Sequence, residues 1–435
     1  MSKLEVDKVT PQSGTTLTIG DSGDTTNIVG TLQNNGGALD GVTFKEGGTN
    51  FTNSLLVGTS STGTLSSADG NTGVGTGVFG ALTTGDNNVA VGLNALDVNT
   101  TGSDNTALGC GALLANTTGS CSVAIGVCAL KTATTTGANT AVGHHASRDN
   151  TTGYFNVAVG KDAMLENTEG RCNTAVGSCA MQSNTTGNFN TAVGHDAMKE
   201  NTTASNNDAF GNHALAANTT GDQNVAIGRA SLDANTTGDD NTALGYVALS
   251  ANTTASDNTA IGSCALLANT TGDCNTAVGR SSLDTNTTGT RNVAVGGEAL
   301  GANTTASFNN ALGYKALCSN TTGASNVSIG TCSMRINTTG ASNVAVGDKA
   351  LCANTTGTEN VGVGSLSLDA NTTGNYNVAV GANSLSANTT ADNNVGIGVA
   401  ALLTNTTGAS NTAVGRHSLR LNTTGCRNTA IGMES

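Results

Sequence analysis

The sequence is poor in the residues from which globular cores are usually built. It has no tryptophan and a single proline, Pro11, while aromatic residues make up 3% and charged residues 11% of its 435 positions. Ordinary soluble domains carry about 25% charged residues. Alanine, valine and leucine supply nearly all of the apolar content, beside 59 glycines. We therefore expect a thin core repeated along the chain, and not the two or three ordinary domains that this length allows.

The shortage of basic residues and of long apolar runs excludes several classes of partner. Only 17 Lys and Arg are scattered among 30 Asp and Glu, so no basic patch can neutralise a nucleic-acid backbone. No segment approaches the roughly 20 apolar residues of a membrane span, and Met1–Lys8 lacks the apolar stretch of a signal peptide. We predict no nucleic-acid partner, no membrane insertion and synthesis in a cytosol. The eleven cysteines occupy no fixed slot, so we expect mostly free thiols.

One glycine recurs every 17 residues from Gly58 to Gly432, at 23 positions without a substitution or a slip. The unit 224–240 reads NVAIGRASLDANTTGDD. Self-similarity at a short fixed period is typical of solenoids, in which one unit buries its apolar side only by stacking on the next. Disorder, which the composition would allow, does not keep glycines in step. The sequence therefore predicts an all-β fold, a parallel β-solenoid of 17-residue coils.

The repeat divides the chain into three regions. Residues 1–57 lie outside the clean repeat and contain two strand-like segments, Thr15–Ile19 and Asn27–Val29, which we interpret as an attachment or capping region. Residues 58–87 form degenerate first repeats, in which Val78 and Phe79 replace the usual Ala-Leu pair. Regular repeats occupy 88–435.

Two apolar columns define the expected lumen. A large apolar residue, such as Val91 or Leu108, precedes each coil glycine, and Leu96 and Leu113 begin a leucine column four residues after it. We expect these two columns to face each other across the lumen, with the intervening segment forming either a second strand or a helical turn. Strand neighbours point to opposite faces, so we expect the alanines before the large residues to form a homotrimer interface, with contact inside the same coil as the alternative. These alanines include Ala90, Ala107, Ala124, Ala141 and Ala158.

Asparagine fills two further columns of the repeat. Asn105 belongs to the column before the strand, and Asn99 and Asn116 open the turn Asn-Thr-Thr-Gly. Stacked at the strand spacing of about 4.8 Å, such side chains can bond to each other and to turn backbone. We interpret both columns as structural ladders.

The two glycine columns differ in how strictly they are kept. The coil glycines, which include Gly92, Gly109 and Gly126, never vary, so we expect a positive φ or no room for a Cβ atom. The turn glycine is replaced by alanine in some units, for example at Ala204. A positive φ is therefore not essential in the turn.

Two stretches of sequence resemble known families. The segment Asn156–Ala163, NVAVGKDA, resembles the head repeat of trimeric autotransporter adhesins, which implies a left-handed parallel β-roll and a trimer of such rolls. The opening Lys3–Asp24 resembles the start of marine bacteriophage tail-fibre proteins. That resemblance implies a fibre trimerised by a self-cleaving C-terminal chaperone, of which this chain has no residues.

A run of metal-ligand residue types occupies the second position after the coil glycine. Stacked about 4.8 Å apart, neighbouring members could share an ion. The same position elsewhere accepts Asn94, Gly111, Ala230, Val247 and Lys315, as a solvated corner would. We therefore predict no metal and no other cofactor, and keep the run as the alternative. Its members are Cys128, His145, Asp162, Cys179, Asp196 and His213.

The motifs favour a structural function. There is no Ser-His-Asp arrangement, no nucleotide-binding glycine loop and no Cys-x-x-Cys pair, so we predict that the protein is not an enzyme. Our hypothesis is the homotrimeric shaft of a virion fibre, a phage tail fibre assembled in the host cytoplasm. It would join a virion attachment protein through its N-terminal region and contact a host surface receptor such as a glycan. The alternatives are a cell-surface or extracellular adhesin and an ice-binding solenoid with paired threonine columns.

Overall fold

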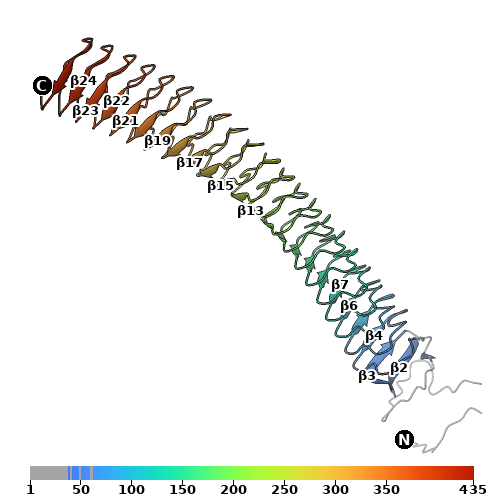
Figure 1. Ribbon diagram of the computed structural model, residues 1–435. Coiled ribbons are helices and arrows are strands. Elements are labelled where there is room, and N and C mark those ends of the chain that lie inside the picture. Colours follow the sequence, from blue (N-terminus) through green and yellow to red (C-terminus); the bar gives the residue numbers. More distant parts are fainter. Residues whose placement is uncertain (1–37, 40–41, 49, 59–61) are drawn as a thin grey trace, which may run out of the picture.

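The computed structural model of the protein describes residues 38–39, 42–48, 50–58 and 62–435. These residues form 25 strands and no helix, and thus no helix able to cross a membrane. From β4 onward each strand has three residues and successive strands are parallel, which confirms the predicted parallel β-solenoid. The coils stack into a long curved rod with the strands along one side (Figure 1).

The strands recur at the 17-residue interval of the repeat. Their bounds are β4 Thr72–Val74, β5 Val89–Val91, β6 Thr106–Leu108, β7 Val123–Ile125, β8 Thr140–Val142, β9 Val157–Val159, β10 Thr174–Val176, β11 Thr191–Val193, β12 Asp208–Phe210, β13 Val225–Ile227, β14 Thr242–Leu244, β15 Thr259–Ile261, β16 Thr276–Val278, β17 Val293–Val295, β18 Asn310–Leu312, β19 Val327–Ile329, β20 Val344–Val346, β21 Val361–Val363, β22 Val378–Val380, β23 Val395–Ile397, β24 Thr412–Val414 and β25 Thr429–Ile431.

The stack begins on a hairpin. Strand β1 (Ala38–Leu39) pairs antiparallel with β2 (Val42–Gly48), and β2 pairs antiparallel with β3 (Phe51–Val57). Strand β3 then pairs parallel with β4. The first rung of the solenoid therefore precedes Gly58. The strand-like segments predicted at 15–19 and 27–29 lie outside the described residues.

Every pairing between consecutive coils has the same register. In β5 and β6, for example, Val89, Ala90 and Val91 lie opposite Thr106, Ala107 and Leu108. Because each offset equals the repeat length, every side chain stacks on its own counterpart in the next coil. This stacking gives each column of the sequence a continuous row in the structure.

The lumen is filled by alanine, leucine and asparagine. Ala90, Ala95, Leu96, Asn99 and Asn105 are all fully buried within the single chain. The prediction for the leucine column is thus confirmed. The strand faces the opposite way from the prediction, because its middle alanine, and not the large residue after it, points into the lumen.

The alanine row is therefore not an intermolecular interface. Ala90, Ala107, Ala124, Ala141 and Ala158 are each 0% exposed in one chain. Their small size has a cause inside the coil: a Cβ atom added to Gly362 in the same row would lie 3.4 Å from Leu351 Cδ1. Ser367 of the same coil is closer still, with its Oγ 3.0 Å from that point, and together these neighbours leave room for alanine and little more. Contact inside the same coil, the alternative considered above, is what the structure contains.

The segment after the coil glycine is neither a strand nor a helical turn. Asn94 and Leu96 both have left-handed backbones, with φ of 55° and 51°. Such conformations cost an L-residue roughly 1 kcal/mol or more. Hydrogen bonds between coils offset this cost, since Leu96 N donates to Ala112 O (3.1 Å) and Asn94 N to Thr76 O (2.9 Å). The segment is a series of turns held by its neighbours.

Both asparagine ladders are present as predicted. Asn105 Nδ2 donates to Asn88 Oδ1 (3.1 Å) and to Gly119 O (2.9 Å). In the second ladder, Asn116 Nδ2 donates to Asn99 Oδ1 at 2.9 Å. Buried amides without partners would be costly. The ladders satisfy them and also bind the turn carbonyls.

The coil glycine meets both conditions that its invariance suggested. Gly92 has φ of +132°, and a Cβ atom there would lie 2.6 Å from Gly109 O in the next coil. L-residues rarely adopt this backbone conformation. No positive φ occurs at the turn glycine Gly102, and Ala204 occupies the equivalent turn position. This confirms the prediction that a positive φ is not essential in the turn.

Candidate functional site

The residue before each coil glycine points outward and forms an apolar row along the rod. We call this row the aliphatic stripe. Its members on β5 to β25 are Val91, Leu108, Ile125, Val142, Val159, Val176, Val193, Phe210, Ile227, Leu244, Ile261, Val278, Val295, Leu312, Ile329, Val346, Val363, Val380, Ile397, Val414 and Ile431.

The members of the stripe are partly exposed although all are large and apolar. Leu108 is 46% and Leu312 49% exposed. The predicted lumen position of Val91 and Leu108 is thus wrong, because the third strand residue shares a face with the first and not with the buried alanine. Val89 and Val293, at the first strand position, are exposed on the same side. A soluble monomer rarely presents so long an apolar surface, and such a surface marks an interaction site.

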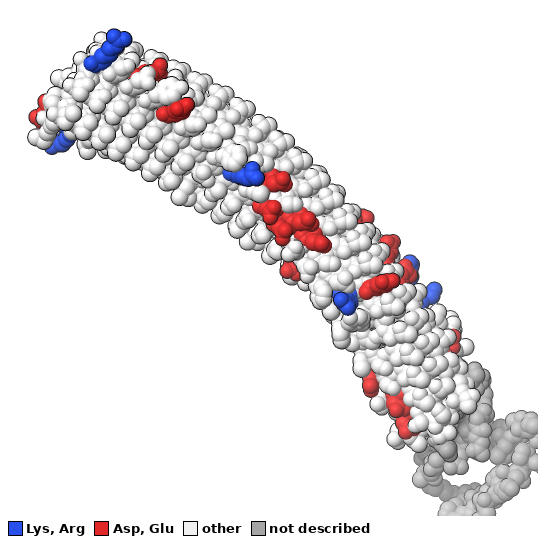
Figure 2. Space-filling model, viewed as in Figure 1, with Lys and Arg blue, Asp and Glu red and all other residues white. Residues whose placement is uncertain are grey.

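Charge is sparse over most of the rod. Figure 2 shows acidic and basic side chains in scattered groups separated by long uncharged stretches. The recorded ion pairs join residues of one coil or of adjacent coils, such as Lys315 with Glu298 (3.4 Å). Exposed pairs of this kind contribute little to stability. The apolar and hydrogen-bonded columns hold the coils together.

The threonines of the turn form one exposed row and not two. Thr100 Oγ1 donates to Thr117 O in the next coil at 2.9 Å, so this hydroxyl is occupied. The second threonine, Thr101, is exposed. An ice-binding plane requires hydroxyls in at least two parallel rows on one face. The geometry does not favour that alternative.

Exposed aromatic side chains gather at the corner that precedes the strand. Phe155 is 60% and Phe189 53% exposed. Nearby, Arg171 Nη1 donates to Tyr154 Oη at 2.7 Å, and its guanidinium lies 5.8 Å from the centre of the Tyr154 ring. Tyr154, Arg171 and Glu169 line one shallow hollow. Aromatic faces beside hydrogen-bonding groups suit a receptor contact.

The structure brings together part of the predicted run of metal-ligand residues. His145 and Asp162 lie in one cluster with His144, and Asp196 and His213 lie in another with His195. Cys128 and Cys179 belong to neither cluster. Sequence reasoning missed His144 and His195 because it followed a single column, whereas both come from the adjacent column, directly after the coil glycine. A search of both columns would have found them.

Another hollow contains an acidic residue with an altered pKa. Arg280, Asp284, Glu298 and Gly301 line this hollow. Burial, and secondarily the charge of Glu298, raise the pKa of the Asp284 carboxyl, against hydrogen bonds that lower it. A raised pKa alone does not identify a catalytic acid.

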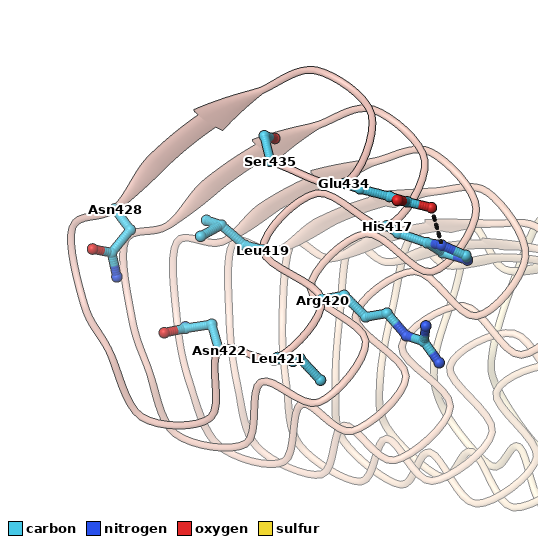
Figure 3. A pocket seen from close by; sticks show the side chains of 8 residues that line it. All are labelled: His417, Leu419, Arg420, Leu421, Asn422, Asn428, Glu434 and Ser435. Carbon is cyan, nitrogen blue, oxygen red and sulfur yellow. Dashed lines mark ion pairs between the residues drawn. The ribbon is translucent and has the colours of Figure 1, made fainter.

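The lumen is visible in cross-section at the last described coil. Figure 3 shows Leu419, Asn422 and Asn428 around a hollow with His417 and Glu434 at its rim. His417 Nδ1 lies 3.7 Å from Glu434 Oε1. The equivalent leucines and asparagines of earlier coils are buried by the coil that follows. This hollow is the general interior of the solenoid.

No protein-family model matches the chain, and no curated protein matches it significantly.

Proposed function

We propose that the protein forms the shaft of a virion fibre, a phage tail fibre in which copies of the chain associate through the aliphatic stripe. The stripe is the single observation that carries the proposal. It runs the length of the rod, and its members are large and apolar at every strand from β5 to β25. A lone rod would leave the exposed part of each member in water.

The area of the stripe is sufficient for a stable assembly. Nine members have 36–49% of their surface exposed, Ile431 has 74%, and the others are partly buried. The row therefore offers on the order of 1,000 Å² per copy, compared with about 800 Å² per partner in stable complexes. Three rods with their stripes turned to a common axis would bury it, in a homotrimer of closed symmetry. The fibre would place a receptor contact at a distance from the virion. At about 4.8 Å per coil, the rod spans on the order of 100 Å.

The resemblance of the opening segment to tail-fibre proteins, and of the repeat to adhesin head repeats, supports the same function. The exposed aromatics around Tyr154 and Phe155 would supply a contact for a surface receptor such as a glycan. In this proposal the N-terminal region joins a virion attachment protein. A cell-surface or extracellular adhesin is the second candidate, since a stiff apolar-faced rod would serve there as well. Detection of the protein in purified virions separates the two.

The mass in solution tests the assembly. The chain of 42.7 kDa should elute as a particle of three copies, measured by light scattering. Replacing both Ile227 and Leu244 by aspartate should yield monomers, because charges cannot be buried in the apolar contact. A matched variant with Thr237→Asp and Thr254→Asp adds the same charge at exposed turn positions. It should stay trimeric.

Two results would contradict the proposal. One is a monomeric wild-type protein at micromolar concentration. The other is a trimer that persists in the doubly substituted stripe variant, which would place the contact elsewhere on the rod.

A further inference from the structure

Histidine is concentrated in one short part of the rod. Four of the five histidines lie between Gly143 and His213, all in the two positions after a coil glycine. The fifth, His417, occupies the same kind of position far along the chain. Elsewhere these positions carry unrelated residues such as Ala230, Val247 or Leu366. The concentration therefore does not follow from the repeat itself.

We propose that His195, Asp196 and His213 form a binding site for a divalent transition-metal ion of the zinc class. Their ligand atoms lie within 4.8 Å of one another. His195 Nδ1 is 3.1 Å and His213 Nε2 3.6 Å from Asp196 Oδ2. Two ligands of a tetrahedral zinc ion with bonds of about 2.0 Å are roughly 3.3 Å apart. The observed distances match this spacing without large movement of either imidazole.

The backbone holds these residues in a fixed arrangement. Asp196 and His213 both have left-handed backbones, with φ of 55° and 58°. His213 N donates to His195 O at 3.0 Å, which ties the two coils together at the site. A metal site needs its ligands on rigid elements. Stacked coils provide that rigidity at a corner that is still open to solvent.

The remaining coordination positions have candidates as well. The carboxamide of Asn212 lies beside the site, with Nδ2 3.5 Å from His195 Nδ1. Rotation of this amide turns its oxygen towards the same point. The two histidines are about half exposed while Asp196 is 15% exposed. Water can therefore complete the coordination of the ion.

The second cluster offers a weaker version of the same site. His145 Nδ1 lies 3.4 Å from Asp162 Oδ1, and His144 stands beside them. Lys161 Nζ also pairs with Asp162, at 3.2 Å, and competes with a cation. The recorded ion pairs of Asp196 involve only histidines.

Zinc titration of the chelator-treated full-length protein, followed by calorimetry, tests the proposal. The wild type should take up one zinc ion per chain tightly and a second more weakly. His213→Gln should weaken the tight site by about tenfold or more, and His145→Gln should remove the weak site. His417→Gln is the matched control, because His417 also faces a carboxylate across one coil. It should change neither site.

Cobalt in place of zinc distinguishes the site from the chain's many thiols. Cobalt bound by imidazole and carboxylate should show weak visible bands without a thiolate charge-transfer band. Circular dichroism and elution volume should be the same for all variants, since none of the altered side chains is buried in the lumen. The proposal is overturned if His213→Gln binds zinc as the wild type does, if no zinc is taken up, or if a thiolate band accounts for all bound cobalt.

Discussion

The coils between Asn99 and Asn150 differ from those between Asn150 and Asn422 in the continuity of their lumen. In the first group Ala133 interrupts the second asparagine ladder, and Asn116 Oδ1 is buried without a hydrogen-bond partner. In the coil that follows the one with Ala133, Ser147 replaces a lumen leucine, and its hydroxyl is also buried without a partner.

In the second group each asparagine of the second ladder donates to the one before it without a gap, and the one unpaired ladder amide there is Asn394 Nδ2 of the first ladder. The strand register is nevertheless the same in both groups. The backbone and its glycines therefore set the register. The lumen side chains determine how firmly each coil is held, and four predictions test this division of roles.

The largest effect is expected at the coil glycines, and it should be equal in the two groups. Gly126→Ala and Gly245→Ala each force an L-residue to a φ near +140° and place a Cβ atom against the backbone of the next coil. We expect a loss of about 3 kcal/mol or more. Hydrogen exchange of the backbone amides should become faster in both substituted coils, and by the same factor. Gly297→Ala is the control, because an added Cβ atom there would lie 3.6 Å from the Tyr314 ring and another unit carries Ala382 at this position; it should cost far less.

Leu232→Ser copies the defect of Ser147 into a regular coil. It removes a fully buried side chain and leaves a buried hydroxyl, so the free energy of opening the coil should fall by about 3 kcal/mol. Exchange rates in the segment 228–249 should rise to those around Ser147. Unchanged protection there would show that the lumen leucines do not hold the coils.

Ser147→Leu is the reverse experiment and repairs the defect. Burying the leucine and removing the unpaired hydroxyl should stabilise the local coil by about 2 kcal/mol. Hydrogen exchange between Gly143 and Gly160 should slow. Faster exchange would mean that this part of the lumen is too narrow for leucine.

Ala133→Asn closes the gap in the ladder and should have the smallest effect. The new amide should donate to Asn116 Oδ1, which now lacks a partner, for a gain of about 1 kcal/mol. Amide nitrogen chemical shifts of the Asn116 side chain report the bond directly. An unchanged shift and unchanged stability would contradict this account of the ladder.

The columns of the sequence predicted the solenoid, both ladders and the role of the coil glycine. The prediction of which strand face is buried was wrong, because alternation defines two faces without orienting them. A signal was present: Asp208 and Asn310 occupy the first strand position, which shares a face with the stripe. Polar residues there indicate that this face lies outside the lumen.

Neither the conformation of the turns nor the two histidine and aspartate clusters could be predicted from the sequence. Left-handed φ values at Leu96 or Met164 contradict the local preferences of these residues and depend on bonds to the next coil. Similarly, the approach of His195 to His213 depends on how far each side chain leans along the rod. Such contacts follow from the stacked backbone and not from spacing alone.

Because the register is the same at every coil, the number of coils can change without changing the kind of contact between them. Every coil contacts its neighbours through the same columns, so deleting or duplicating 17 residues would leave each remaining contact of the same type. The rod would become shorter or longer by one strand spacing, about 4.8 Å. Any other insertion would move alanines, leucines and asparagines out of their rows. A gene that encodes this chain can thus change its reach in equal steps through recombination between repeats, at little cost to folding.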